Sequence, residues 1–206
     1  MVIATKQSEK SRQTDLKVAY SAASAVRTVG VDQMALTRVA ADAGFSSGAI
    51  YARCDDRSEL VVLAWEKSFW PMLSEMITLL ADAVISKDNT SMSRIAELFI
   101  RSTDPGIVPD LGSAMEVIIA SRRDETIGEV VQRDINGLLD DRGVGPSTDG
   151  ASRQAVVSAI CTLFGASILN SVFSTSDSET PQIDPTDLLE TFTRSLRTPV
   201  KPGPGR

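Results

Sequence analysis

The sequence predicts an all-α protein built from a small N-terminal head and a larger helical body. Apolar residues recur at the three- and four-residue spacing of helices through most of the 206 residues. No run alternates β-branched and polar residues between turn signals, as a half-buried strand would. Hydrophobic residues make up 42% of the chain and charged residues 23%, which is ordinary globular usage. We therefore expect a folded chain of helices.

Two helices are expected before residue 45, each ending at a glycine. The first spans 15–29, with Thr14 as its N-cap, and the second spans 36–43. Gly30 and Gly44 follow them directly. Glycine is the residue best able to adopt the left-handed backbone found at helix exits, so both positions predict C-terminal ends.

Two side-chain caps predict the next two helices. Ser46 is placed to cap a short helix that ends near Arg53. Asp56 and Glu59 form a capping-box pattern at the start of an apolar run that continues to about residue 86. Three helices and the start of a fourth thus fill the first sixty residues.

The body is predicted to continue as helices. Pro71 interrupts the apolar run, and because proline lacks an N–H and crowds the preceding turn, we expect a kink or break near Trp70. Further helices are expected over 91–103, 110–122, 124–141, 151–174 and 185–197. The predicted domains are 1–60 for the head and 61–197 for the body, followed by a Pro- and Gly-rich disordered tail over 198–206.

Charge is distributed unevenly between the two parts. Residues 1–60 carry eight Lys or Arg against seven Asp or Glu, and the remainder carries thirteen against twenty. The net charge of −6 alone argues against a nucleic-acid partner, because phosphate binding needs clustered Lys and Arg. A near-neutral head on an acidic body instead suits a protein that touches DNA with one end.

Composition argues against several other classes. No apolar run follows the basic residues of 1–16, so we expect no secretory signal and a cytoplasmic protein. Cys54 and Cys161 are the two cysteines and no histidine is present, so neither a disulfide framework nor a Cys/His metal site is expected. Without histidine, a nucleophile motif or a phosphate-binding glycine loop, we expect no enzyme and no cofactor.

The pattern that points to a function lies in residues 36–60. Two short helices separated by 44–46, with the first helix packed across both, form the geometry that lets a helix N-terminus enter a DNA major groove. The stretch VAADAGFSSGAIY over 39–51, followed by RSEL over 57–60, resembles the TetR-type (tetracycline-repressor) family of transcriptional regulators. In that family an Ile-Ala/Ala-Gly helix precedes a Ser-x-Gly-Thr-Leu-Tyr recognition helix and a Lys-Glu-x-Leu helix start. The resemblance covers about residues 16–63.

The sequence departs from the family pattern at four positions. Ala35 stands where the family often has a Ser or Thr cap, and Ala49 where it often has Thr. Cys54 replaces an aromatic residue and Val26 replaces Phe. Two lost hydroxyls remove possible phosphate contacts, so an alternative stays open: a helical interaction or ligand-binding protein that has lost DNA affinity.

Double-stranded operator DNA is the partner that the resemblance implies. Tyr51 and Arg57 suit phosphate contacts, and Arg53 is the one long donor suited to guanine. Gly48 removes a side chain where the recognition helix meets the duplex. The ordinary interpretations are helix packing for Gly48 and solvated surface for the arginines. The expected DNA-binding residues are Thr37, Arg38, Ser46, Ser47, Gly48, Ala49, Tyr51, Arg53 and Arg57.

The family's middle helices enclose an effector cavity, so the resemblance implies a repressor released from a palindromic operator by an unknown small-molecule effector. The candidate ligand-binding residues are Trp65, Phe69, Met72, Phe99, Met115, Glu116, Ile119, Arg122, Asn170 and Phe173. Their aromatic and apolar members suit a largely apolar molecule, and their polar members would orient it. The alternative is that the apolar ones are simply core.

Residues 154–176 contain no charged residue, and their hydropathy would suggest a membrane span over 155–173. Small and polar residues recur through the segment and no basic cluster flanks it, so we prefer a dimer core and expect no membrane partner. The resemblance implies the same homodimer, paired through 151–174 and 185–197. The candidate interface residues are Ala159, Leu163, Ala166, Leu188 and Phe192.

Overall fold

The computed structural model describes residues 2–86, 110–142 and the positions 94, 97, 154, 156–158, 160–162 and 164–165. Every regular element in this part of the chain is a helix, which confirms the predicted all-α class. The elements are α1 (Val2–Val29), α2 (Leu36–Asp42), α3 (Ser47–Tyr51), α4 (Arg57–Ala64), the π-helical turn η1 (Trp65–Phe69), α5 (Trp70–Ser86), α7 (Leu111–Ala120) and α8 (Glu125–Asp141).

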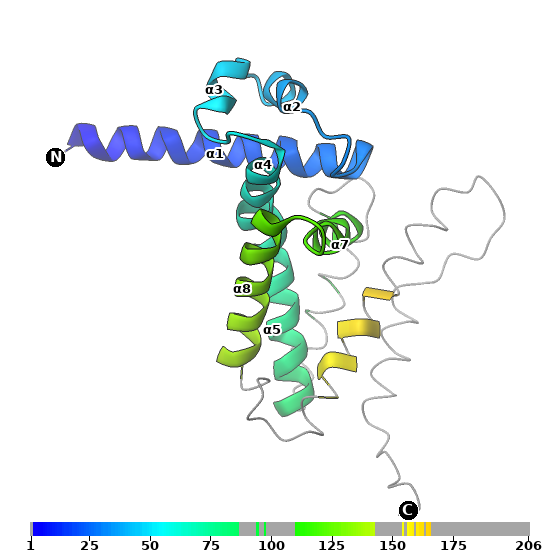
Figure 1. Ribbon diagram of the computed structural model, residues 1–206. Coiled ribbons are helices and arrows are strands. Elements are labelled where there is room, and N and C mark those ends of the chain that lie inside the picture. Colours follow the sequence, from blue (N-terminus) through cyan, green and yellow to red (C-terminus); the bar gives the residue numbers. More distant parts are fainter. Residues whose placement is uncertain are drawn as a thin grey trace, which may run out of the picture.

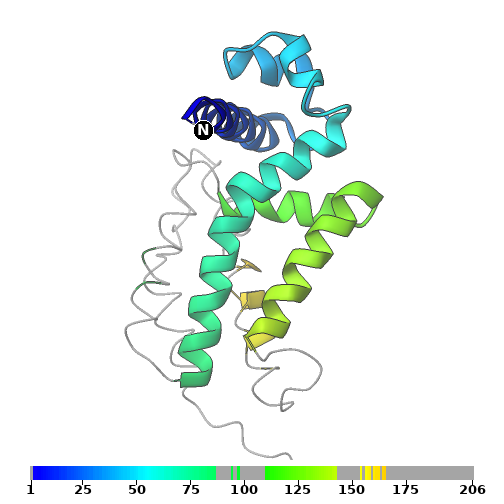
Figure 2. The same ribbon diagram turned by 90° about the vertical axis from the view of Figure 1, so that its left-hand side faces the viewer.

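A long rod made of α4, η1 and α5 connects head and body (Figure 1). Helix α1 lies across the upper end of this rod, and α2 and α3 lie on the far side of α1 from α5. Helix α8 runs beside the rod and α7 crosses next to it. Figure 2 shows α1 nearly end-on and the rod changing direction between α4 and α5.

Helix α1 is longer than predicted, and the expected Thr14 cap is wrong. The helix begins at Val2, and the Thr14 hydroxyl donates to the carbonyl oxygen of Lys10 at 2.9 Å, one turn back within the same helix. No proline or glycine precedes Thr14, so nothing in the sequence stops the helix there. Its first turns project beyond α3 (Figure 1).

The predicted helix ends and the two later caps are confirmed. Gly30 has φ +83° and Gly44 has φ +77°, so both adopt the left-handed backbone. The Ser46 side chain accepts from the Ala49 N–H, and Asp56 accepts from the Glu59 N–H at 2.9 Å.

The rod bends near Trp70, as expected, but Pro71 does not break it (Figure 2). The irregularity is η1, one turn earlier, where the Trp70 N–H bonds to the carbonyl oxygen of Trp65 five residues back. A wider turn makes room for a proline ring that would clash with the carbonyl four residues before it. The Trp65 and Trp70 rings stack across this turn with centroids 5.7 Å apart.

Head and body share one hydrophobic core. The buried cluster includes Val26 of α1, Leu60 of α4, Trp65 of η1 and Val117 of α7. The Trp65 indole N–H also donates to Asp134 of α8 at 3.0 Å. The cluster contains residues from both sides of the predicted domain boundary at residue 60. The head therefore packs on the body through apolar contacts.

Several predicted helices lie wholly or partly outside the described residues. Helix 110–122 is observed as α7 and 124–141 as α8. Arg94 and Glu97 are helical, as are the described positions between 154 and 165, whereas 185–197 and the 198–206 tail lie outside. Within the described part, no helix is long and apolar enough to span a membrane.

Candidate nucleic-acid interface

Helices α2 and α3 form a two-helix unit whose inner side is buried. Val39, Ala40 and Ile50 are 0–1% exposed and belong to the same buried cluster as apolar residues of α1 and α4. The turn at Gly44 between them leaves the N-terminal end of α3 facing away from this core. The arrangement is that of a helix-turn-helix in which the N-terminal end of the second helix is exposed.

The outer side of this unit is formed by most of the predicted DNA-binding residues. Thr37 and Arg38 of α2 are exposed. Four residues at α3 are exposed as well: Ser46, Ser47, Gly48 and Tyr51, of which Tyr51 is 51% exposed. Ala49 is half-buried. A Cβ added at Gly48 would have no atom within 4 Å, so the backbone there opens directly to solvent. Another molecule is therefore able to approach this backbone closely.

Arg53 is held by neighbouring groups in the head. Its Nε donates to Asp15 Oδ1 of α1 at 2.9 Å, and its Nη1 donates to the carbonyl oxygen of Ala49 at 2.9 Å. Both contacts fix the direction of the guanidinium at the C-terminal end of α3. Two of its nitrogen atoms are therefore already engaged within the head. The use of Arg53 to read a base stays a prediction.

Arg57 begins α4 and is exposed. Its Nη1 donates to the carbonyl oxygen of Asp32, in the connection between α1 and α2. The planar guanidinium has five donors, so the remaining N–H groups are available for a phosphate. Arg38 lies on α2 with no ion-pair partner among the described residues.

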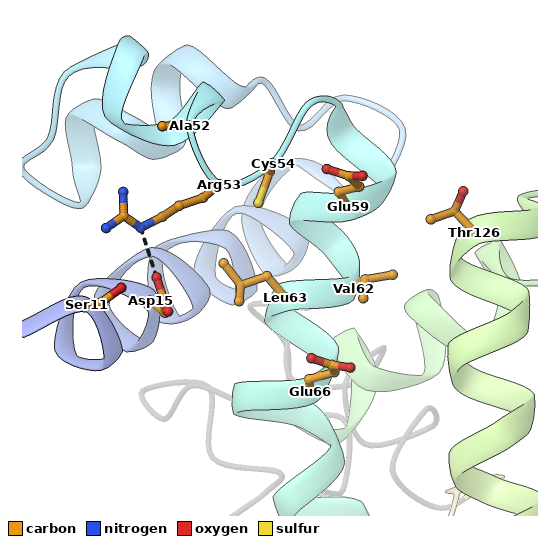
Figure 3. A pocket seen from close by; sticks show the side chains of 10 residues that line it. All are labelled: Ser11, Asp15, Ala52, Arg53, Cys54, Glu59, Val62, Leu63, Glu66 and Thr126. Atoms are coloured by element: carbon orange, nitrogen blue, oxygen red, sulfur yellow. Dashed lines mark hydrogen bonds and ion pairs between the residues drawn. The ribbon is translucent and has the colours of Figure 1, made fainter. Parts of the chain in front are cut away.

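A cleft of about 610 Å³ lies where α1, the α3–α4 connection and α4 meet α8 (Figure 3). The Arg53–Asp15 ion pair lies at its left-hand side in this view, and Glu59 and Glu66 add further carboxylates. Cys54 is 2% exposed at its edge, and burial, followed by the charges of Glu59 and Asp15, raises the pKa of its thiol to about 11. The thiol is therefore protonated at neutral pH.

The predicted ligand-binding residues occupy unlike environments. Trp65 and Phe69 are 0% exposed, Met72, Met115 and Glu116 are half-buried, and Ile119 and Arg122 are exposed. Phe99, Asn170 and Phe173 lie outside the described residues, as do the dimer candidates Ala159, Leu163, Ala166, Leu188 and Phe192. A shared ligand site for these residues stays a prediction.

Sequence reasoning missed two features of the body. Glu116 Oε1 accepts a hydrogen bond from the Val31 N–H at 2.7 Å, so this carboxylate contacts the head. Ser68 is 3% exposed on η1, and its hydroxyl has no hydrogen-bond partner in the described part of the protein. The first contact joins residues 85 positions apart, and the second depends on a π-helical turn, so neither leaves a local sequence signal.

Comparison with known proteins supports this fold. The structure of the fatty acid degradation regulator FadR from Bacillus halodurans is similar, with a TM-score of 0.54. The similarity covers 87% of this chain and 92% of FadR, at 16% sequence identity. No protein-family model matches the sequence, and no curated protein matches it. At this identity the likeness to FadR shows a shared fold, and its coverage takes in the body as well as the head.

Proposed function

We propose that this protein is a DNA-binding transcriptional regulator of the TetR type that acts as a homodimer. The observation that carries the proposal is the exposed N-terminal end of α3, where Ser46, Ser47 and Gly48 face outward above a buried Ile50. A helix end presented in this way fits a major groove, and its free surface is polar. The likeness of the fold to FadR, itself a regulator, supports the same function.

Charge favours contact through the head alone. Arg38 on α2 and Arg57 at the start of α4 are exposed cations at either end of the α2–α3 unit. Phosphate contacts at two such points fix a protein's register on the duplex without reading sequence. The acidic body is repelled by the DNA phosphates, which disfavours orientations that bring the body against the duplex.

We further propose that a small, largely apolar effector binds in the body and releases the protein from a near-palindromic operator. Two identical heads related by a two-fold axis would read inverted half-sites. FadR is described as a regulator of fatty acid degradation, and this description supports an apolar effector for the protein proposed here. The stacked Trp65 and Trp70 give the body an intrinsic fluorescence probe for such binding.

A second candidate is a helical interaction protein without DNA affinity. The N-terminus of α2 favours it, because Ala35 provides no side-chain hydrogen bond there. Ala49 likewise lacks the hydroxyl that the TetR-type recognition helix often carries. Fewer phosphate contacts would lower affinity for every duplex.

Fluorescence anisotropy with duplex DNA from the region beside the protein's own gene tests the proposal. We expect tighter binding to one duplex than to a scrambled duplex of equal length, with affinity falling as salt rises. Equal, weak affinity for both duplexes would refute sequence-specific regulation and favour the second candidate.

A further inference from the structure

Among the described residues, the turn-linked pair α7 and α8 is joined to the head by apolar contacts and by two hydrogen bonds. Glu116 of α7 accepts a hydrogen bond from the Val31 N–H at 2.7 Å. Asp124, the N-cap of α8, accepts one from the Ser58 hydroxyl in the first turn of α4. Val31 lies in the connection that leads into α2, and Ser58 lies in the helix that follows α3. The two contacts therefore bracket the α2–α3 unit on both sides.

A third hydrogen bond joins the two bracketing segments inside the head. Arg57, next to Ser58, donates to the carbonyl oxygen of Asp32, next to Val31. On the body side, Glu116 and Asp124 are connected by the end of α7 and a short turn. The contacts thus form a closed ring, so a shift of α7 against α1 must either break the ring or turn the α2–α3 unit.

Gly30 is shaped for the Glu116 contact. Its φ is +83°, and a Cβ placed there would lie 2.8 Å from Glu116 Oε1. The carboxylate therefore occupies space that only a glycine leaves open. Val31 is 5% exposed, so without Glu116 its N–H would lose its partner in a buried setting.

The helix dipole of α1 does not favour a negative charge on Glu116 at this place. The C-terminal end of a helix carries partial negative charge, so a carboxylate beside the end of α1 is electrostatically disfavoured there. What Glu116 supplies is one acceptor oxygen for the Val31 N–H. A neutral acceptor of the same length is expected to keep this hydrogen bond.

We propose that Glu116 is a positioning residue for DNA binding: through Val31 it fixes the orientation of the α2–α3 unit relative to the body. This inference rests on the proposed function. In a homodimer the two α3 helices must meet major grooves about 34–36 Å apart, so a small rotation at Val31 misplaces the second head once the first has bound. One head on one half-site does not need the correct spacing.

The experiment compares a full inverted-repeat operator with a duplex that carries a single half-site. The variants are Glu116→Ala, Glu116→Gln and the control Glu129→Ala, which removes an exposed carboxylate of α8. We expect Glu116→Ala to weaken binding to the full operator by at least about fivefold and to leave half-site binding unchanged. Glu116→Gln keeps an acceptor oxygen and should restore wild-type binding, and Glu129→Ala should match wild type.

Equal loss on both duplexes, or no loss on either, would overturn the positioning role. Failure of the wild-type protein to prefer the full operator would refute the dimeric regulator instead. Hydrogen exchange supplies a readout that needs no DNA: Glu116→Ala should speed exchange at the Val31 amide and in α2, whereas Glu116→Gln should not. Unchanged exchange in α2 would overturn the inference whatever the DNA result.

Discussion

Arg53 and Asp15 form an ion pair that joins the C-terminal end of α3 to α1, with Nε 2.9 Å from Oδ1. Their side chains are 27% and 32% exposed, so water still screens the pair. The main effect of the pair is to orient the Arg53 guanidinium beside the C-terminal end of α3. Its contribution to stability is small.

Asp15→Ala is therefore expected to lower the free energy of unfolding by less than about 1 kcal/mol. If Arg53 reads a base, Asp15→Ala should also relax the base preference at one operator position, because the carboxylate that orients the guanidinium is lost. Urea unfolding and a set of single-base operator variants measure the two effects. A stability loss of several kcal/mol would show that the pair is structural.

Arg57→Ala and Arg53→Ala should affect DNA binding in different ways. A phosphate contact carries no base information, so Arg57→Ala should weaken all sequences alike and reduce the slope of log affinity against log salt by about one. Arg53→Ala should instead reduce discrimination at one position. Arg123→Ala, an exposed cation between α7 and α8, is the charge-matched control. Equal loss of discrimination in both head variants would contradict the assignments.

Gly48→Ala should lower DNA affinity without lowering the stability of the fold. A Cβ meets no atom within 4 Å at Gly48 of α3 or at Gly137 of α8. Alanine is better than glycine in a helix by up to about 1 kcal/mol, so both substitutions should keep or raise thermal stability. Operator affinity should fall for Gly48→Ala alone, because the added methyl group separates α3 from the groove. Unchanged affinity would place the duplex away from Gly48.

The two left-handed glycines should differ in their tolerance of alanine. Gly44→Ala meets no atom and should cost about 1–2 kcal/mol for its backbone conformation. Gly30→Ala should cost more, because its Cβ also meets Glu116 Oε1 at 2.8 Å. Adding Glu116→Ala to Gly30→Ala should recover part of the loss in denaturant unfolding. Additive effects in this double-mutant cycle would argue against the contact.

Cys54 should make the folded state less stable at high pH. Its pKa is about 11 in the folded protein against an ordinary value of 9.0, mainly because the thiol is buried. The unfolded state then loses the proton first, so the stabilising effect is complete below pH 9 and is lost as pH rises toward 11. Cys54→Ala should flatten this part of the stability profile. Iodoacetamide should react with Cys54 only once the protein unfolds, because the thiol is buried in the folded state.

Local chemistry in the sequence predicted the head well. Gly30 and Gly44 marked helix exits, and Ser46 and Asp56 marked helix starts, because each signal acts within four residues. Thr14 failed because a threonine inside a helix can bond to the preceding turn as readily as it caps a new one. Pro71 predicted an irregularity, but its ring was accommodated by η1 without a break.

Long-range contacts were beyond the same reasoning. The bond from Val31 to Glu116 and the pair of Arg53 with Asp15 depend on how helices cross, which periodicity does not specify. Exposure of most of the predicted DNA-binding residues followed from the helix-turn-helix pattern, whereas the internal partners of Arg53 and Arg57 did not.

Selection of bound sequences from a random duplex library, with the purified wild-type protein, tests the central claim most directly. If α3 reads a major groove and two heads act together, repeated rounds should enrich one inverted repeat whose half-site centres lie about one helical turn apart or a multiple of it. The enriched sequence should lose affinity when either half-site is changed. Recovery of no common sequence at low salt would contradict a sequence-specific regulator.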